Sequence, residues 1–434
     1  MASEWQQTQF GNLLAGPVRN GVYKPKEYHG RGSKVVNMGE LFACPRLRSI
    51  PMKRVQLSAV EAERFDVRKG DLLFARRSLV AEGAGKCSVV LDTDEPTTFE
   101  SSIIRARPDP SKADSLFLFY FFNSIAGLHA LDTIRRHVAV AGITGSDLVR
   151  LEVPVPRIDE QRAIVHILGT LDDKIDLNGR MNETLDAMAR ALFKSWFVDF
   201  DLVRVKTDGR EPGLPKPLAD LFPDSFEDSE LGEIPKGWRV STLGEVAEHA
   251  RRGVQPSEIE ATTPYIALEH MPRRSIALSE WSVADGLESN KFMFMEVEIL
   301  FGKLRPYFHK VGIAPVDGVC STDIVVVAPR TEKWFGFVLG HVSSTALVEY
   351  TNARSTGTKM PRTSWGEMAG YPVVTPPEGV AEAFTKASRV AVDRIAASIH
   401  ESRTLAELRD ALLPKLISGE LRVKDAEKFI RSAS

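Results

Sequence analysis

The sequence has few of the features that mark secreted, membrane-spanning or zinc-binding proteins. Its 434 residues include only three cysteines. Because Cys44, Cys87 and Cys320 lie far apart, they argue against a disulfide framework or a zinc site. No apolar run approaches the roughly 20 residues that a membrane helix needs, and the first residues lack the basic flank and apolar stretch of a secretory signal. We therefore expect a cytoplasmic protein with reduced thiols and no membrane span.

The sequence also lacks the motifs of common catalytic and cofactor sites. The segment Gly83–Cys87 resembles a phosphate-binding loop, but it lacks the first glycine and has Cys87 where a serine or threonine would bind Mg²⁺. There is no glycine-rich dinucleotide fingerprint, no Asn-Pro-Pro-aromatic motif of amino-methyl transfer and no metal-ligand spacing of histidines. We expect no catalytic residue, no metal and no cofactor on this chain.

The charge of the chain is nearly balanced but unevenly distributed. The formal net charge of −2 neither indicates nor excludes nucleic-acid binding, because phosphate contacts depend on local patches. Basic residues gather between Arg19 and Arg54, where only Glu27 and Glu40 are acidic. A run of charge is as often a solvated face, so this stretch alone leaves both interpretations open.

Two parts of the sequence are near copies of two others. Asp173–Ile175 recurs as Asp393–Ile395, with the register kept further along, and Asp71–Phe74 recurs as Glu298–Phe301. Basic residues follow both members of the second pair. A globular segment followed by a long helix, repeated once, gives one polypeptide the symmetry of a dimer. Such symmetry suits the recognition of a two-part target.

Each repeat contains a long stretch typical of a helix. Between Glu160 and about Trp196 there is no proline, and the heptad spacing of apolar residues favours packing against another long helix. Such a helix is about 55 Å long; an ordinary amphipathic helix on a single core is the alternative. Pro414 predicts a kink or an early stop in the second copy. The residues expected to pack in the seam are Ile164, Leu168, Leu171, Ile175, Asn178, Leu185, Leu192, Trp196, Ile395, Leu405, Leu408 and Leu412.

Proline-rich stops separate the globular segments from the helices, since proline ends regular structure. We expect an α+β fold: two globular α/β-mixed domains separated by two long antiparallel helices that form a coiled coil, with pseudo-two-fold symmetry. The predicted division is a first globular domain over 1–155, a first long helix over 156–200, a linker over 201–235, a second globular domain over 236–377, a second long helix over 378–421 and a tail over 422–434.

Two stretches of the second globular segment interleave cations with aromatic residues. Phe301–Lys310 and Gly357–Trp365 suit contact with phosphates and base edges. For either stretch alone, a basic turn with a packed aromatic is the alternative, but their co-occurrence favours nucleic-acid binding. The candidate DNA-binding residues are Lys34, Arg46, Arg48, Arg76, Arg77, Lys86, Thr144, Lys303, Arg305, Lys310, Lys359 and Arg362.

A set of short segments recurs here in an order and spacing typical of one family. They are Glu160–Ile164 after Pro154–Pro156, Leu171–Ile175, Ala191–Phe197, Gly232–Trp238, Gly357–Arg362 and Leu413–Leu421. With these segments the chain resembles the specificity subunits of type I restriction–modification systems over almost its whole length. One departure is Val380-Ala381-Glu382, which stands where a second Glu-Gln-Arg is expected. It bears on whether the two partner-docking faces are equivalent.

The resemblance implies two target-recognition domains, each reading one half of a split site in double-stranded DNA, with the helices as a spacer. It also implies docking of two methyltransferase subunits and of restriction subunits, which would bind S-adenosylmethionine and ATP. The chain itself would be non-catalytic. Two alternatives remain: a helical scaffold whose globular modules bind proteins rather than DNA, and a methyltransferase or nuclease, which the missing motifs disfavour.

Overall fold

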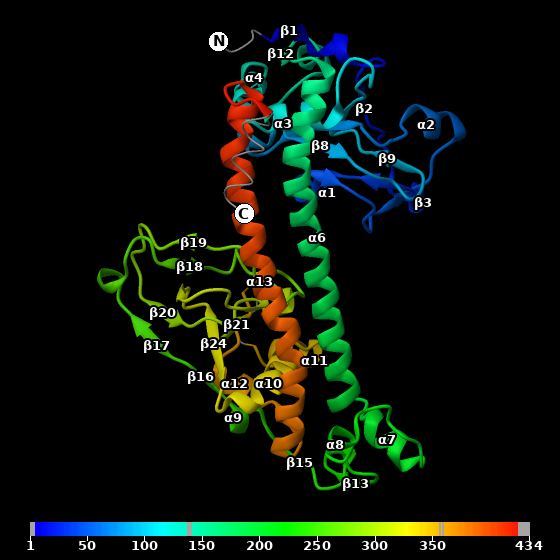
Figure 1. Ribbon diagram of the computed structural model, residues 1–434. Helices are drawn as coiled ribbons and strands as arrows, with labels where there is room; N and C mark the ends of the chain where they lie inside the picture. Colours follow the sequence, from blue (N-terminus) through cyan, green and yellow to red (C-terminus); the bar gives the residue numbers. More distant parts are fainter. Residues whose placement is uncertain (1–4, 137–140, 356, 358–359, 424–434) are drawn as a thin grey trace. The chain divides into compact units, whose positions relative to one another are not determined.

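Two long helices, α6 (Ile158–Phe197) and α13 (Glu378–Ile417), are the largest elements of the computed structural model, which describes residues 5–136, 141–355, 357 and 360–423. They are drawn in green and in orange to red in Figure 1. Each has 40 residues and is therefore about 60 Å long. Among the described residues, no helix has the length and apolar character needed to cross a membrane.

Pro414 does not stop α13, contrary to the early stop that the sequence suggested. The helix continues through Pro414 to Ile417. The side chains of Leu412, Leu416 and Ile417 are buried in the core of the adjoining globular segment. We attribute the continuation to this burial, which offsets the hydrogen bond that a proline removes near the end of a helix.

The chain divides into two compact units, and both long helices pass through the division. Unit 1 contains Met1–Asp173 and Leu405–Ser434, and unit 2 contains Lys174–Thr404. Each unit therefore has one globular segment and a part of each long helix. The domain boundaries predicted from sequence lie at the ends of the long helices, whereas the division into compact units falls within those helices. The predicted boundaries therefore stay predictions.

Unit 1 is a mixed α/β structure built on two main sheets. The strand orders are β2-β10-β6-β8-β4 and β5-β3-β9, with the small pairs β1-β12 and β11-β7 beside them. The strands are β1 (Gln6–Gln9), β2 (Arg19–Asn20), β3 (His29–Val36), β4 (Arg46–Leu47), β5 (Arg54–Val55), β6 (Leu72–Ala75), β7 (Arg77–Ser78), β8 (Cys87–Val90), β9 (Thr97–Phe99), β10 (Ile103–Ala106), β11 (Ala141–Gly142) and β12 (Glu152–Val155). The shorter helices are α1 (Met38–Ala43), α2 (Ala59–Arg64), α3 (Ser115–Phe122), α4 (Ile125–Thr133) and α5 (Gly145–Leu148).

The core of unit 1 is rich in phenylalanine. The rings of Phe10, Phe74 and Phe122 pack edge to face with centroids 4.9 to 5.9 Å apart. Asp114 caps α3 by accepting from two backbone N–H groups at the start of the helix. The fully buried Gln161 of α6 in turn accepts from the Asp114 N–H at 2.8 Å. This glutamine therefore ties the apolar helix α3 to α6.

Unit 2 is also a mixed α/β structure built on two main sheets. Its main sheets have the orders β16-β24-β21-β22 and β17-β20-β23-β18-β19, with the pairs β15-β25 and β13-β14. The strands are β13 (Phe226–Ser229), β14 (Gly232–Pro235), β15 (Arg239–Thr242), β16 (Ala247–His249), β17 (Arg252–Val254), β18 (Pro264–Ile266), β19 (Ser282–Val283), β20 (Lys291–Phe294), β21 (Ile299–Gly302), β22 (Val311–Ile313), β23 (Gly318–Cys320), β24 (Ile324–Pro329) and β25 (Pro372–Thr375). The shorter helices are α7 (Asp201–Thr207), α8 (Lys216–Ala219), α9 (Leu243–Val246), α10 (Phe335–Val342), α11 (Thr345–Arg354) and α12 (Trp365–Ala369).

The segment 201–235, predicted as a linker, contains helices α7 and α8 and the hairpin β13-β14. Val203 and Phe222 are buried in the main core of unit 2. Pro215 and Pro217 lie at the start of α8, where proline is tolerated. The proline-rich, acidic composition of this segment suggested a linker, but the segment contains regular secondary structure.

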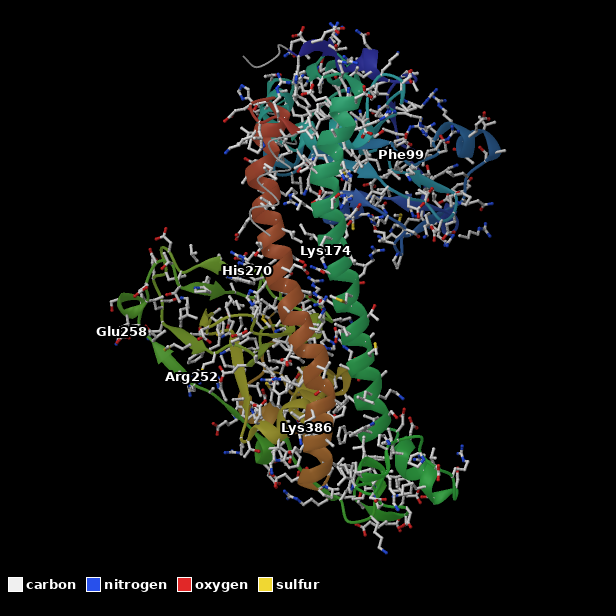
Figure 2. All side chains as sticks on the ribbon, viewed as in Figure 1. Phe99, Lys174, Arg252, Glu258, His270 and Lys386 are labelled. Carbon is white, nitrogen blue, oxygen red and sulfur yellow. The ribbon has the colours of Figure 1, made fainter. Side chains whose placement is uncertain are left out.

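The long helices pack antiparallel within each unit. In unit 1, Asp172 of α6 pairs with Arg409 of α13 at 2.7 Å. In unit 2, Lys174 of α6, labelled in Figure 2, pairs with Glu401 at 3.2 Å. Buried seam residues are Ile164, Leu168, Leu171, Asn178, Trp196, Ile395 and Leu412, and partly buried ones are Ile175, Leu185, Leu192, Leu405 and Leu408.

A polar layer interrupts the seam in unit 2. The buried Asn178 amide donates to the Glu401 carboxylate at 2.9 Å and to the Ser402 hydroxyl at 3.1 Å. Asn182, one turn further on, accepts from the hydroxyl of the buried Ser398. Such a layer disfavours other registers of the two helices, because a shifted pairing would leave these buried groups without partners.

The departure at Val380-Ala381-Glu382 has a local structural account. Ala381 stands where Gln161 stands in the first repeat, and it has no side-chain amide with which to bond the adjoining helix. Instead, Thr385 of α13 accepts from the Gly336 N–H of α10 at 3.0 Å and donates to the Lys333 carbonyl at 2.7 Å. The two repeats therefore attach equivalent apolar helices through different side chains.

Candidate nucleic-acid interface

In unit 1 the loop after the central strand β6 is held by its backbone. The Arg76 N–H donates to the Ser102 carbonyl at 2.8 Å, and the Arg76 carbonyl accepts from the Ile143 N–H at 3.0 Å. The next residue, Arg77, pairs with Gly142 between β7 and β11. Within the described part of the chain, the exposed Arg77 side chain has no hydrogen bond or ion pair. The fixed loop therefore presents an available guanidinium to solvent.

In unit 2 the loop after β21 is held in the same way. The Lys303 N–H donates to the Asp323 carbonyl at 2.9 Å, and the Lys303 carbonyl accepts from the Thr363 N–H at 3.0 Å. A backbone bridge joins Leu304 to Arg362, as the strand pair β7-β11 does in unit 1. We call this pattern the loop frame. It makes Lys303 the counterpart of Arg76.

Several cations surround the loop frame of unit 2. Across the described residues, the Lys303 ammonium makes no hydrogen bond or ion pair. Arg362 is half exposed and pairs with Asp323 at 3.0 Å. Burial, followed by the charges of Arg251 and Lys303, lowers the pKa of His249. Arg251 and Lys303 thus place positive charge near His249.

Arg305 is a further predicted residue close to this loop. Arg305 has a left-handed φ of 51° and lies 5.9 Å from the centre of the Phe308 ring. Arg273 lies over the same ring at 4.3 Å. Lys359 lies outside the described residues. Arg251 and Arg273 were not among the sequence candidates, although each belongs to an Arg-Arg pair, which is a signal that could have found them.

Lys86 and Lys310 are counterparts that point inward. The carbonyl of Lys86 bonds the last residue of β6, and the carbonyl of Lys310 bonds the last residue of β21. The Lys86 ammonium donates to the Phe42 carbonyl at 3.2 Å, and the Lys310 ammonium donates to the Leu268 carbonyl. Burial lowers the pKa of Lys310. These lysines stabilise nearby turns, so we do not include them in the proposed DNA surface.

Lys34 also has a partner inside its own unit. Its side chain is 9 % exposed, and its ammonium pairs with Asp94 at 2.9 Å and with Glu95 at 3.2 Å. Two carboxylates already neutralise this charge. The structure therefore gives Lys34 an intramolecular role rather than the predicted DNA contact.

Arg46 and Arg48 attach the first globular segment to α6. Both donate to the Asp173 carboxylate, at 2.6 Å and 3.0 Å. Arg46 also lies 4.0 Å from the buried Asp172, which accepts from Tyr120 at 2.7 Å. The basic stretch of the sequence thus supplies ion pairs to the long helix, which the sequence prediction of DNA contacts did not foresee.

Thr144 has a structural role at the start of α5. Its hydroxyl accepts from the Asp147 N–H at 3.2 Å and donates to the Asp147 carboxylate at 2.7 Å. Ser364 and Glu367 form the equivalent cap of α12 in unit 2. A helix cap explains the hydroxyl at this position without a DNA contact.

Known proteins share both the fold and the sequence pattern of this chain. The crystal structure of the type I restriction–modification S subunit from M. genitalium superposes with a TM-score of 0.56 at 15% identity, covering 95% of this chain and 96% of that one. The family model for the type I restriction modification DNA specificity domain matches residues 21–187.

Two relatives in sequence extend this match. The MjaIX specificity subunit of Methanocaldococcus jannaschii is 27% identical over 72% of this chain and 70% of its own length. The HindI specificity subunit of Haemophilus influenzae is 23% identical over 82% and 87%. The chain is similar to type I restriction–modification specificity subunits in sequence and in fold. The family model covers most of the globular segment of unit 1 and most of α6. The loop frame occurs in both units.

Proposed function

We propose that this chain is a DNA specificity subunit that reads a bipartite, asymmetric site in double-stranded DNA, with one half-site for each globular segment. The observation that carries the proposal is the loop frame. It occurs once in each unit with the same backbone bonds but different side chains, Arg76-Arg77 in unit 1 and Lys303-Leu304-Arg305 in unit 2. Two loops that are held by the same backbone bonds but carry different side chains are suited to reading two different half-sites. The similarity to type I specificity subunits favours this function over a scaffold that binds no DNA.

Cations on the two loops would hold the DNA and read it. The available side chains of Arg77 and Lys303 can neutralise phosphates, which fixes the position of the protein but carries no sequence information. A guanidinium can instead bond the O6 and N7 edge of guanine in the major groove, where all four base pairs are distinguishable. Arg362, half exposed beside Asp323, is the candidate for such a contact in unit 2.

In this proposal the helix pair sets the distance between the half-sites. Half-sites that are read from one side of the duplex lie about one helical turn, ~34 Å, apart. A helix of about 60 Å can connect two domains over that distance. The polar layer around Asn178 would keep the two helices in register, so that the length of the spacer becomes part of the specificity.

The partners and cofactors belong to the same proposal. Two methyltransferase subunits would dock on the helical regions and carry S-adenosylmethionine, and restriction subunits would carry ATP, so this chain would be non-catalytic. The assembly would act in the cytoplasm. Leu177 and Met188 of α6 are 51% and 62% exposed. Apolar side chains exposed on a long helix are consistent with such a docking face.

Charge removal at the loop frames tests the DNA contact. In the complex with the partner subunits, Lys303→Ala and Arg77→Ala should each weaken binding to all DNA sequences. Each lost phosphate contact should lower the slope of log affinity against log salt by about 0.9. The control is Arg239→Ala, which removes an exposed cation that pairs with Glu245 away from the loop frame. Unchanged salt slopes in both loop variants would remove the two residues from the interface.

Lengthening the helix pair tests the spacer separately. Seven residues inserted after Asn178 in α6 and after Ser398 in α13 should lengthen the pair by about 10.5 Å. At 3.4 Å per base pair, the preferred spacer should grow by about three base pairs. Mapping of methylated sites in cells that express the complex would measure this. An unchanged spacer with normal DNA affinity would contradict the spacer role and leave the DNA-reading role intact.

A further inference from the structure

A cleft in unit 1 is lined by five arginines. It has a volume of about 520 Å³, and two carboxylates, Glu63 and Asp66, lie among the arginines. The arginines are Arg19, Arg64, Arg68, Arg105 and Arg107. Only Arg19 belongs to the basic stretch noted in the sequence. The others come from α2, from the turn that follows it and from the region of β10, so the fold brings them together.

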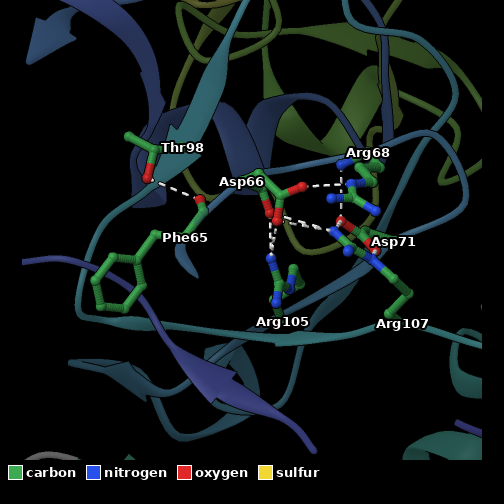
Figure 3. A network of polar contacts seen from close by, with 7 residues as sticks. All are labelled: Phe65, Asp66, Arg68, Asp71, Thr98, Arg105 and Arg107. Carbon is green, nitrogen blue, oxygen red and sulfur yellow. Dashed lines mark hydrogen bonds and ion pairs between the residues drawn. The ribbon is translucent and has the colours of Figure 1, made fainter. Parts of the chain in front are cut away.

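One carboxylate serves three of these guanidinium groups (Figure 3). Asp66 bonds Arg105 at 2.9 Å, pairs with Arg107 at 3.3 Å and also bonds Arg68. The Arg107 guanidinium also donates two hydrogen bonds, of 2.7 and 2.9 Å, to the carboxylate of the fully buried Asp71. Asp66 therefore fixes the floor of the cleft but cannot neutralise all the charge around it.

The remaining arginines leave the cleft positively charged. Arg19 stands opposite Arg105 in the pairing of β2 with β10, and like charges directly opposite each other destabilise a sheet. Within the described residues, neither Arg19 nor Arg64 has a carboxylate partner. Even if Asp71 is counted with Glu63 and Asp66, positive charge is in excess. An anion in the cleft would relieve the repulsion.

The cleft is separate from the loop frame of unit 1. In the pairing of β10 with β6, Ala106 stands opposite Leu72 and Ile103 stands opposite Ala75. Arg105 and Arg107 therefore lie towards the beginning of β6, whereas the loop with Arg77 follows its end. The loop frame and the cleft lie at opposite ends of this strand.

We propose that the arginine cleft is a phosphate-binding site. Guanidinium groups bind phosphate oxygens through paired hydrogen bonds, and several donors from different elements suit a tetrahedral oxyanion better than a single carboxylate. The phosphate could belong to the DNA backbone, in which case the site rests on the proposed function and extends the contact beyond the loop. It could also be a free phosphate.

The first experiment measures the thermal unfolding of the full chain in sodium phosphate and in sodium chloride of equal ionic strength. Phosphate should raise the unfolding midpoint by roughly 3–5 °C for each tenfold increase above the dissociation constant. The double variant Arg19→Gln, Arg64→Gln should lose this rise. Both side chains lie outside the Asp66 network, so the variant should unfold at or above the wild-type midpoint in chloride. The control Arg157→Gln, at a side chain that is 91% exposed, should keep the rise.

The second experiment distinguishes the two sources of phosphate. In the complex with its partners, a DNA-backbone site predicts that the double variant lowers the salt slope of binding to any sequence by about 0.9 per lost contact. A free-phosphate site predicts normal DNA binding together with loss of the phosphate effect on unfolding. The proposal is overturned if the double variant keeps the phosphate effect, or if phosphate stabilises no form and the salt slope is unchanged. Arg77→Ala and Lys303→Ala test the loops independently.

Discussion

Replacing Arg46 by alanine separates a structural role from a DNA contact. The side chain is 9 % exposed, and it joins the first globular segment to Asp172 and Asp173 of α6. After truncation, Asp172 keeps its bonds from Tyr120 and Arg409. The loss includes a charge-assisted bond to the exposed Asp173 and the packing of a buried aliphatic stem.

The expected loss is about 2 kcal/mol of unfolding free energy, from roughly 0.8 kcal/mol for each buried methylene and a small term for the ion pair. For a unit of about 200 residues, this lowers the unfolding midpoint by roughly 4–8 °C. Arg48→Ala is the matched control. Its side chain is 35% exposed and donates to the same exposed carboxylate, so its loss should be well under half as large.

Two assays distinguish a structural role of Arg46 from a DNA contact. Thermal unfolding of the chain should show the loss of stability, and the salt slope of DNA binding by the complex should match that of the wild type. A stable Arg46→Ala variant with a salt slope reduced by about 0.9 would refute the structural role and restore the DNA contact.

Two further predictions concern a partly buried lysine and a buried histidine of unit 2. Lys310→Met should lower the unfolding free energy in urea by about 1–3 kcal/mol, because the Leu268 carbonyl loses a charged donor; a lower salt slope of DNA binding with unchanged stability would contradict this. Burial lowers the pKa of His341 to about 3, against 6.5 ordinarily. The unfolded chain therefore gains a proton that the folded chain does not, and stability falls as the pH drops below 6.5. From neutral pH to about pH 5.5 this amounts to roughly 1.4 kcal/mol. His341→Phe should remove this part of the pH dependence of urea unfolding, and an unchanged profile would show that His341 is protonated in the fold.

The sequence revealed the elements that depend on local pattern. The heptad spacing around Leu168 and Leu192 predicted the long helices, because a helix of that length needs a continuous apolar stripe. The similarity of Asp71–Phe74 to Glu298–Phe301 identified two strands that occupy equivalent places in their sheets. These features are encoded within a few neighbouring residues.

Whether a given cation forms an ion pair within the fold depends on residues that are distant in sequence. Lys34 meets Asp94, and Arg46 meets Asp173, over separations of 60 and 127 positions. Nothing local to either cation indicates those partners. The arginine cleft was missed for the same reason, since Arg64 and Arg105 become neighbours only through the fold. Charge pattern alone could not separate ion pairs that hold the structure from cations that face solvent.

The loop frame has a consequence for how new specificities arise. Its bonds run between backbone groups of Lys303, Asp323 and Thr363, and backbone groups are the same whatever side chain is attached. Substitution at the Lys303 or Arg77 position can therefore change the side chain that a loop presents without altering how the loop is held. Under the proposed function, each globular segment could then acquire a new half-site by point mutation, one unit at a time, while the other would continue to read the old one.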